Sequence, residues 1–385
     1  MEQKRTKRSR GALGTAVAVV CYMLIGAVSG LFILQVQDDL LPAEASAPLR
    51  LLVFLGLLGV LYLVILLQYA IHEAGHLLFG RLSGYGFNSY RVGSCMWVKE
   101  GDRVRFRRYS LAGTGGQCLM SPPDLVEGRM PVLLYNLGGA VMNVASALLS
   151  GGLWLLLRES PLPSALLGMF TLTGLAMALM NGLPMRVGMV DNDGRNALSL
   201  MRNPGAIRAF WAQMKAVEAT SRGVRAKDMP AEWFALPEEE GMEDSISAGA
   251  WVLACNRLMD EHRFSEADGL MERILSRSSG LSGLHRAMLL SDRVYVELIG
   301  ENRPEALAAL LDKEQRKMMK AMKTSPSVLR TQYAYALLAE KNAAGAKKWL
   351  DLFEKVAKTY PYPVDVESER ELMDIARQRA EGQQK

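Results

Sequence analysis

Cysteine and histidine are both scarce in this chain of 385 residues. The four cysteines, Cys21, Cys95, Cys118 and Cys255, are scattered and form no CxxC pair. This spacing argues against a disulfide-stabilised scaffold and against a cysteine-based zinc site. Histidine also occurs only four times, so the position of each one is informative. The formal net charge of +5 is too small to predict nucleic-acid binding, and we expect no nucleic-acid partner.

Charged residues are missing from four long stretches in the first half of the chain, although they make up 22% of all residues. Each stretch has about 20 residues or more, which is enough for a helix to cross a hydrocarbon core about 30 Å thick. Hydrophobic residues reach 50% of the chain, which also favours a membrane protein. We therefore predict membrane-spanning helices near 11–35, 51–80, 130–157 and 164–185.

Lysine and arginine are distributed unevenly among the segments that flank these spans. Residues 2–10 and the 81–129 loop are basic, whereas the 36–49 loop contains acidic residues and neither Lys nor Arg. Basic flanks stay in the cytoplasm, so we expect a multi-pass protein of a bacterial-type inner membrane with both termini cytoplasmic. The first apolar run exceeds the about 7–15 residues of a signal-peptide core, which favours an anchor; cleavage after the small residues of 43–47 is the alternative.

The 81–129 loop has the pattern of a small β-hairpin. Large and charged residues alternate between 90 and 106, on either side of a Gly-Asp turn. Three glycines that would let the chain approach a membrane site closely follow this pattern: Gly113, Gly115 and Gly116.

The second span contains an HExxH sequence, residues 72–76. On a helix, residues four apart face the same side, so His72 and His76 can bind one Zn²⁺. Glu73 is not a ligand in this pattern, and it is placed to take a proton from the attacking water. An ionisable cluster inside an apolar span is energetically costly and therefore indicates function. A cluster of charged groups at the membrane interface is the alternative.

A zinc hydrolase needs a third protein ligand. No further histidine occurs before His262, so a carboxylate must complete the set. Two candidates, Asp191 and Asp193, follow the fourth span, which runs in the same direction as the second and therefore ends on the same side. Gly194 favours Asp193, because glycine lets the chain turn tightly beside a metal; Asp191 is the alternative.

Together these motifs resemble the site-2 protease family of intramembrane zinc metalloproteases. The resemblance covers about 50–200 and rests on 72–76, on Asn181 with Pro184, on Asp193–Gly194, and on Gly138, Gly139 and Asn143 in the third span.

The resemblance implies that His72, His76 and Asp193 hold one zinc ion per chain and that Glu73 is the general base. The implied substrate is a membrane-embedded or membrane-near segment of another protein. The interval between Asn181 and Asp193 is longer than the family usually has. For this reason Asp191, which lies nearer to Asn181, stays the alternative third ligand.

Asn143 and Asn181 lie within predicted spans, where an amide without a partner is costly. They either join helices by hydrogen bonds or bind the substrate backbone or the oxyanion of the reaction. We expect the glycines of the third span to allow close helix packing rather than to take part in catalysis.

The chain after about 186 is charged and contains no further apolar span. Residues 195–219 have the pattern of an amphipathic helix interrupted at 203–205, and an acidic linker follows at 238–240. After 245, weak self-similarity at a period of about 40 residues predicts helical hairpins similar to tetratricopeptide repeats. Such surfaces commonly bind peptides, so we expect this tail to select substrates or to bind a regulator.

The predicted fold is an all-α polytopic membrane protein with four spans and a small β-hairpin, followed by a cytoplasmic α-helical repeat domain. The expected activity is that of a zinc metalloendopeptidase. The alternative is a catalytically inactive, membrane-anchored helical-repeat scaffold. The predicted units are an anchor and external loop (1–48), a metalloprotease core (49–200), an amphipathic helix and linker (201–245) and the repeat domain (246–385).

Overall fold

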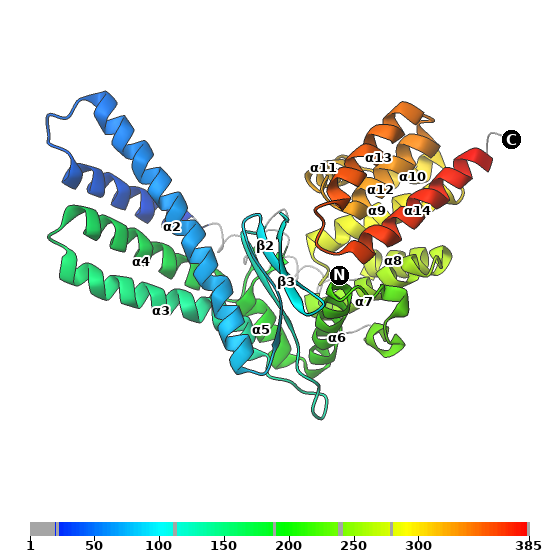
Figure 1. Cartoon of the computed structure of the whole chain (residues 1–385), viewed down its shortest axis with the longest axis horizontal. Coiled ribbons are helices and arrows are strands. Elements are labelled where there is room, and N and C mark those ends of the chain that lie inside the picture. The colour runs from blue at the N-terminus through cyan, green and yellow to red at the C-terminus, as the bar shows by residue number, and fades with distance from the viewer. Residues whose placement is uncertain are drawn as a thin grey trace, which may run out of the picture.

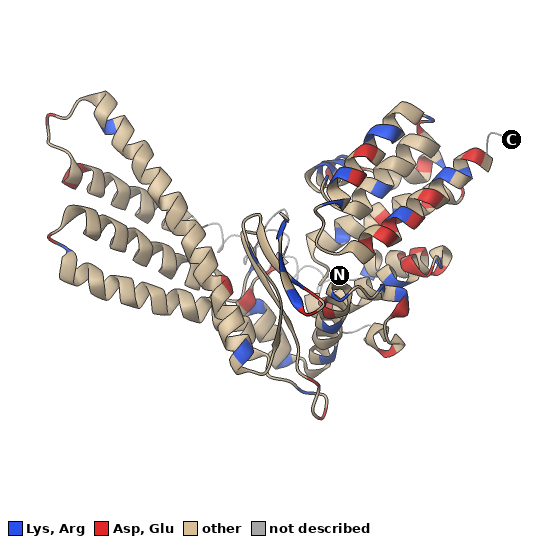
Figure 2. Cartoon of the chain, viewed as in Figure 1, with Lys and Arg blue, Asp and Glu red and all other residues tan. Residues whose placement is uncertain are grey.

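The computed structural model describes residues 20, 23–110, 114–187, 190–237, 242–277 and 280–382. Long apolar helices form one side of the molecule, shorter helices form the other, and a small sheet lies between them (Figure 1). Charged residues are sparse along the long helices and frequent along the short ones (Figure 2). The two halves that the composition predicts are therefore spatially separate.

Four helices among the described residues are long and apolar enough to cross a membrane, which confirms the predicted membrane character. They are Met23–Leu40, α2 (Ala47–Leu82), α3 (Leu133–Leu157) and α4 (Pro161–Gly182). Most of the first half of the predicted span 11–35, and the basic residues before it, lie outside the described residues. With 36 residues, α2 is about 54 Å long at 1.5 Å per residue, so it extends beyond a hydrocarbon core of about 30 Å.

A four-stranded antiparallel sheet stands where the sequence predicted a single hairpin. β2 (Cys95–Glu100) and β3 (Arg103–Arg108) form that hairpin, and Gly101 in its turn has φ +60°, a conformation that favours glycine. β1 (Gly86–Val92) and β4 (Gly116–Ser121) extend the sheet in the order β3-β2-β1-β4. β4 is thus an edge strand. Its sequence, GQCLMS, hardly alternates, so the pattern did not reveal it; Gly113 lies outside the described residues.

The predicted amphipathic segment forms two helices, after a short hairpin of β5 (Arg186–Val187) and β6 (Val190–Asp191). α5 (Asp193–Arg202) ends and α6 (Pro204–Ser221) begins around Asn203, whose side chain accepts a hydrogen bond from Gly205. The predicted interruption is therefore correct. α6 packs on β4 and α7, and Trp211 Nε1 donates to the Pro123 carbonyl at 3.0 Å, so its apolar side is covered by protein.

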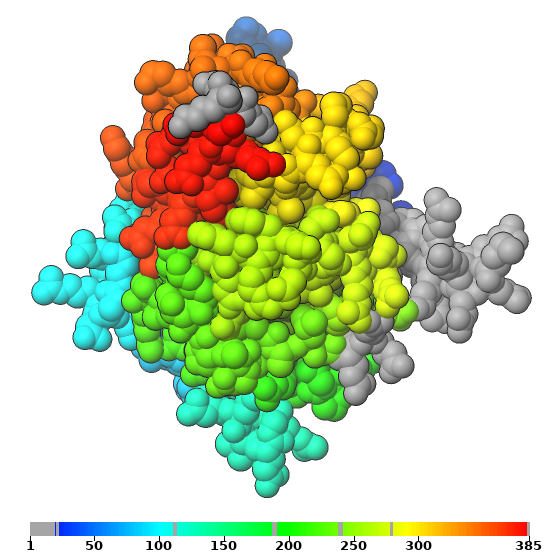
Figure 3. Space-filling view, turned by 90° about the vertical axis from the view of Figure 1, so that its right-hand side faces the viewer, coloured from blue at the N-terminus to red at the C-terminus, as the bar shows by residue number. Residues whose placement is uncertain are grey.

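The tail is a bundle of helices that covers most of the face seen in Figure 3. Helices begin at 264, 304 and 343, at intervals close to the predicted period of about 40 residues, but α10 is short and α11 intervenes before α12; the repeat itself stays a prediction. The predicted linker 238–240 lies outside the described residues. The elements are two 3₁₀ turns (Ala226–Asp228, Ala231–Phe234), α7 (Ser245–Asp260), α8 (Phe264–Arg277), α9 (Gly283–Ile299), α10 (Pro304–Leu310), α11 (Lys313–Ala321), α12 (Pro326–Ala334), a π-helical turn (Tyr335–Ala339), α13 (Ala343–Ala357) and α14 (Pro363–Gly382).

Candidate metal centre

Small residues bring α3 close to the turn of α2 that contains His72 and His76. A β-carbon on Gly75 would lie 2.3 Å from the Gly138 carbonyl oxygen, and one on Gly139 would lie 2.5 Å from Cε1 of His72. Larger residues at these positions would push the helices apart. Gly138 and Gly139 therefore have the packing role that the sequence predicted, and they bury the histidines against α3.

Asn192 fixes the start of α5 and so places Asp193. Its Oδ1 accepts hydrogen bonds from the Met185 and Arg195 amides, both at 3.0 Å, and its Nδ2 donates to two carbonyls at the end of α4. A β-carbon on Gly194 would lie 2.2 Å from the Gly182 carbonyl oxygen. Gly194 is thus needed for close approach of α5 to α4, rather than for the tight turn expected from the sequence.

Asp193 meets both histidines, whereas Asp191 does not. Asp193 Oδ2 lies 3.0 Å from Nε2 of His72 and 3.4 Å from Nε2 of His76. The two Nε2 atoms are 3.2 Å apart, and the three ligand atoms lie within 4.8 Å of one another. Asp191 instead pairs with Arg186 at 2.7 Å and Arg195 at 3.1 Å. This geometry favours Asp193 as the third ligand.

The other ring nitrogen of each histidine is held by a hydrogen bond. Asn143 Nδ2 donates to the Oε1 and the carbonyl of Gln68, at 2.8 and 3.2 Å, so its Oδ1 must accept from Nδ1 of His72, 2.7 Å away. Nδ1 of His76 donates to the Tyr135 carbonyl at 2.7 Å. With Nδ1 as the donor, Nε2 is the ring nitrogen that each imidazole turns toward Asp193, and it is the atom left to bind a metal.

Gln68 and Tyr135 are members of the site that the sequence analysis missed. Gln68 is fully buried, and its Nε2 donates to the Phe170 carbonyl at 3.0 Å, which fixes the amide that holds Asn143. The available signal was a lone amide in an apolar span, one helical turn before His72. Tyr135 acts through its backbone carbonyl, so its residue type gave no signal.

A cavity of about 480 Å³ opens onto these groups and contains Glu73 and Asn181, but not Asn143, in its wall. Of the two expectations for Asn143, the contacts support helix joining: its amide, on α3, is engaged by Gln68 and His72 of α2. Asn181 Nδ2 donates to the Met177 carbonyl of its own helix at 3.0 Å, so Asn181 stays a candidate for contact with a bound molecule.

Strand β4 and the tail complete the cavity. A β-carbon on Gly116 would lie 2.4 Å from Oε1 of Glu73, so glycine lets the sheet lie directly against this carboxylate, as Gly115 does against the ring of Tyr69. Leu284 of α9 contributes to the wall from the tail. The cavity is therefore formed jointly by the apolar helices, the edge of the sheet and the tail.

Asp193 is the site carboxylate that lies outside the spans. Burial raises its pKa, but the facing His76 and His72 lower it more, so its pKa is well below the ordinary value. Asp193 is thus ionised at neutral pH, which is the form that binds a metal.

Comparison of the chain with family models, with curated proteins and with solved structures gives no match in any of the three.

Proposed function

We propose that this chain is an intramembrane zinc metalloendopeptidase that hydrolyses peptide bonds in membrane-embedded or membrane-near segments of other proteins from the cytoplasmic side. The observation that carries this proposal is the convergence of two imidazole nitrogens and one carboxylate oxygen beside Glu73. Such a ligand set leaves a fourth position open, as hydrolytic zinc sites do.

The residues present fit a zinc ion. His72, His76 and Asp193 would hold it, because their ligand atoms face one another and the second ring nitrogen of each histidine is already engaged. When bound, Zn²⁺ would supply Lewis-acid chemistry, polarising the scissile carbonyl and lowering the pKa of the attacking water.

Glu73 supplies the proton transfers in this proposal. Its carboxylate opens into the same cavity as the three ligands but belongs to none of the ligand pairs. It accepts a proton from the attacking water and delivers one to the departing amine. The close fit of Gly116 against Glu73 limits the positions that the carboxylate can adopt, which keeps it directed at the reacting atoms.

The edge of β4 is a docking surface for the substrate backbone. Residues 116–119 line the cavity, and β1 pairs with only one side of this strand. An extended peptide can add to the free side through main-chain hydrogen bonds. The Cys118 carbonyl of this strand already accepts a hydrogen bond from the Tyr135 hydroxyl at 2.9 Å. A helical substrate would therefore have to unwind locally before it is cut.

The position of the site along α2 supports cleavage near one membrane surface. His72 lies 25 residues after the start of α2, or about 38 Å along a helix axis. This distance exceeds a hydrocarbon core of about 30 Å, and the sheet and the tail lie at the same end of α2 (Figure 1). The basic residues of the 81–129 loop favour the cytoplasm as that side.

The experiment that tests the proposal compares the full-length wild type with Glu73→Ala and with Glu44→Ala, a matched change at an exposed loop glutamate. Each is produced in cells that lack the native chain, and membrane proteins are compared by quantitative mass spectrometry. We expect uncut substrates to accumulate with Glu73→Ala but not with Glu44→Ala, while both purified variants retain zinc. Identical cleavage patterns in all three would refute the role of Glu73, and a wild type that never binds zinc would favour the scaffold.

A further inference from the structure

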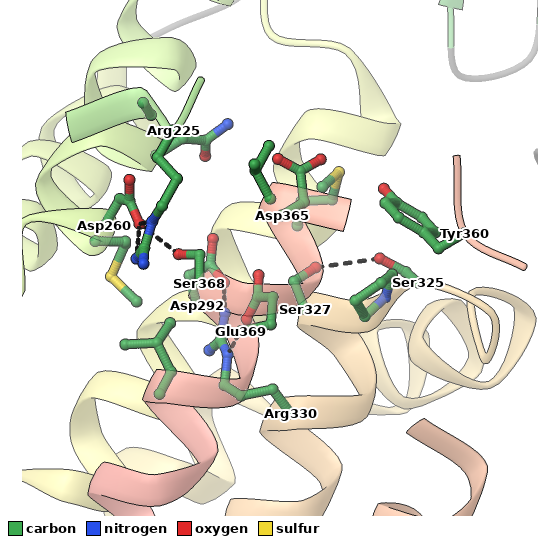
Figure 4. Close-up of a pocket in the computed structure, with 17 residues that line it drawn as sticks. Arg225, Asp260, Asp292, Ser325, Ser327, Arg330, Tyr360, Asp365, Ser368 and Glu369 are labelled. Carbon is green, nitrogen blue, oxygen red and sulfur yellow. Dashed lines mark hydrogen bonds and ion pairs between the residues drawn. The ribbon is translucent and has the colours of Figure 1, made fainter. Parts of the chain in front are cut away.

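The tail contains a polar pocket of about 170 Å³ that is separate from the metal centre (Figure 4). Its walls come from α7, α9, α12 and α14, together with the segments around Arg225 and Tyr360. For comparison, an engineered cavity of about 150 Å³ in another protein holds one benzene molecule. A ligand of this pocket is therefore a small molecule or the end of one side chain.

The cations of this pocket are already neutralised. Arg330 is 1% exposed and lies between Asp292 at 2.6 Å and Glu369 at 2.8 Å. Arg225 pairs with Asp260 at 2.5 Å and also with a glutamate of α14. These guanidinium groups leave little positive charge for an anionic ligand, because each one faces two carboxylates.

Asp365 is the lining carboxylate that has no such partner. It lies in the first turn of α14, is half-buried and lines the pocket, and Figure 4 draws it without a dashed line to another residue. Within the part of the chain that the structure describes, its carboxylate makes no side-chain hydrogen bond or ion pair. The lining thus contains four carboxylates against two guanidinium groups, and one of the four is uncompensated.

We propose that this pocket binds a compact organic cation, an ammonium or guanidinium group on a short chain, with Asp365 as its counter-ion. The hydroxyls of Ser325 and Ser327, 3.1 Å apart, supply further acceptors. Ser325 occupies the N-cap position of α12 but makes no capping bond; its hydroxyl bonds to that of Ser327 and keeps a lone pair for a ligand. The ring of Tyr360 forms one wall and can flank a cation.

An organic cation fits this site better than a metal ion. Among the described residues, the one grouping of His, Cys, Asp and Glu atoms with metal-ligand spacing is His72, His76 and Asp193. Ca²⁺ takes about six to eight oxygen ligands. The pocket offers a single uncommitted carboxylate and two hydroxyls, which are too few.

The same carboxylate destabilises the folded tail when it is ionised without a ligand. Burial, then the nearby Glu369 and Asp260, raise the pKa of Asp365 to about 7. This pKa lies above that of the same carboxyl in the unfolded chain. The loss of folding stability caused by Asp365 is therefore absent in strong acid and grows as pH rises toward about 7. The titratable or charged groups around Asp365 and its pocket are Asp260, Asp292, Glu369, Arg225, Arg330, Tyr109, Tyr360 and Tyr362.

The test uses the full-length chain in detergent and calorimetric titration with butylammonium and butylguanidinium. The neutral control is 1-butanol, and butyrate is the anionic control. We expect the cations to bind wild type and the exposed-site variant Asp351→Asn equally, and affinity to fall by about tenfold or more in Asp365→Asn. The natural cation could be a lysine side chain of a protein or a free small amine, and blocked lysine, Nα-acetyl-lysine methylamide, distinguishes the two. If it binds as tightly as butylammonium, the ligand is a protein side chain; if it binds more weakly, the ligand is a free amine.

Thermal unfolding of the same variants is the control that checks whether Asp365→Asn is folded. We expect this variant to melt at a higher temperature than wild type at about pH 8, and the difference to shrink at about pH 5. The proposal is overturned if neither cation binds to wild type, if butyrate or 1-butanol binds as well as the cations, or if folded Asp365→Asn binds them with unchanged affinity.

Discussion

Buried polar groups are organised differently in the apolar core and in the tail. In the core, a chain of hydrogen bonds runs from Gln68 through Asn143 to His72 and leaves Nε2 of His72 facing Asp193. In the tail, the buried Arg330 is enclosed by its own counter-charges. An open end of a polar network thus indicates a ligand, whereas a closed network indicates a structural role.

The largest expected effect is the loss of the metal from the open network. Asp193→Ala should abolish stoichiometric zinc binding, because it removes one of three ligands. Asp191→Ala, two residues away, should retain zinc because that carboxylate pairs with Arg186 and Arg195 instead. Zinc content of the two purified variants, measured by mass spectrometry, checks the assignment; the reverse pattern would make Asp191 the ligand.

The second effect concerns the closed network. Arg330→Met should destabilise the tail by about 3–5 kcal/mol, because two carboxylates lose their buried partner. Arg263→Met, whose ion pairs are exposed, should leave the unfolding transition unchanged. Denaturant unfolding followed by tryptophan fluorescence measures both. Equal stability of the two variants would show that burial of Arg330 has no energetic consequence.

The third effect tests the hydrogen bond behind His72. Asn143→Ala should weaken zinc affinity by about 10–100-fold, because the imidazole loses the partner that fixes its tautomer. Asn136→Ala is the matched control: it lies in the same helix and lines the same cavity, but its amide donates to the Val132 carbonyl and, among the described contacts, to neither histidine. Competition with a zinc chelator gives both affinities. If zinc affinity is unchanged but cleavage is lost, Asn143 instead contacts the substrate.

The smallest expected effect concerns the contact between the sheet and Glu73. Gly116→Ala adds a methyl group where the carboxylate lies, so we expect kcat to fall by about tenfold while zinc binding is retained. Gly152→Ala is the control, because a β-carbon there meets nothing within 4 Å. Cleavage of a substrate found in the cellular comparison gives the rates. Full activity in Gly116→Ala would show that Glu73 does not depend on this contact.

The sequence predicted the spans and the HExxH turn because both are local patterns. Charge-free stretches define α2, α3 and α4, and spacing alone puts His72 and His76 on one side of a helix. The close approach of α3 was also predictable, since Gly138 and Gly139 are small.

The remainder of the site depends on contacts between distant segments. Gln68 and Tyr135 act only because α2, α3 and α4 pack together, and no single stretch of sequence contains that information. The edge strand β4 was missed for a related reason: it pairs with β1, about 30 residues earlier in the chain, and such pairings are set by tertiary packing rather than by local propensity. The choice between Asp193 and Asp191 likewise required the position of Asn192.

X-ray absorption at the zinc edge, recorded on the purified full-length protein, is the decisive test of the proposed metal centre. We expect one zinc ion per chain with two imidazole nitrogens and a carboxylate oxygen at about 2.0–2.2 Å, and an unchanged protein ligand set in Glu73→Ala. A wild-type protein that binds no zinc, or a spectrum without histidine ligands, would contradict it.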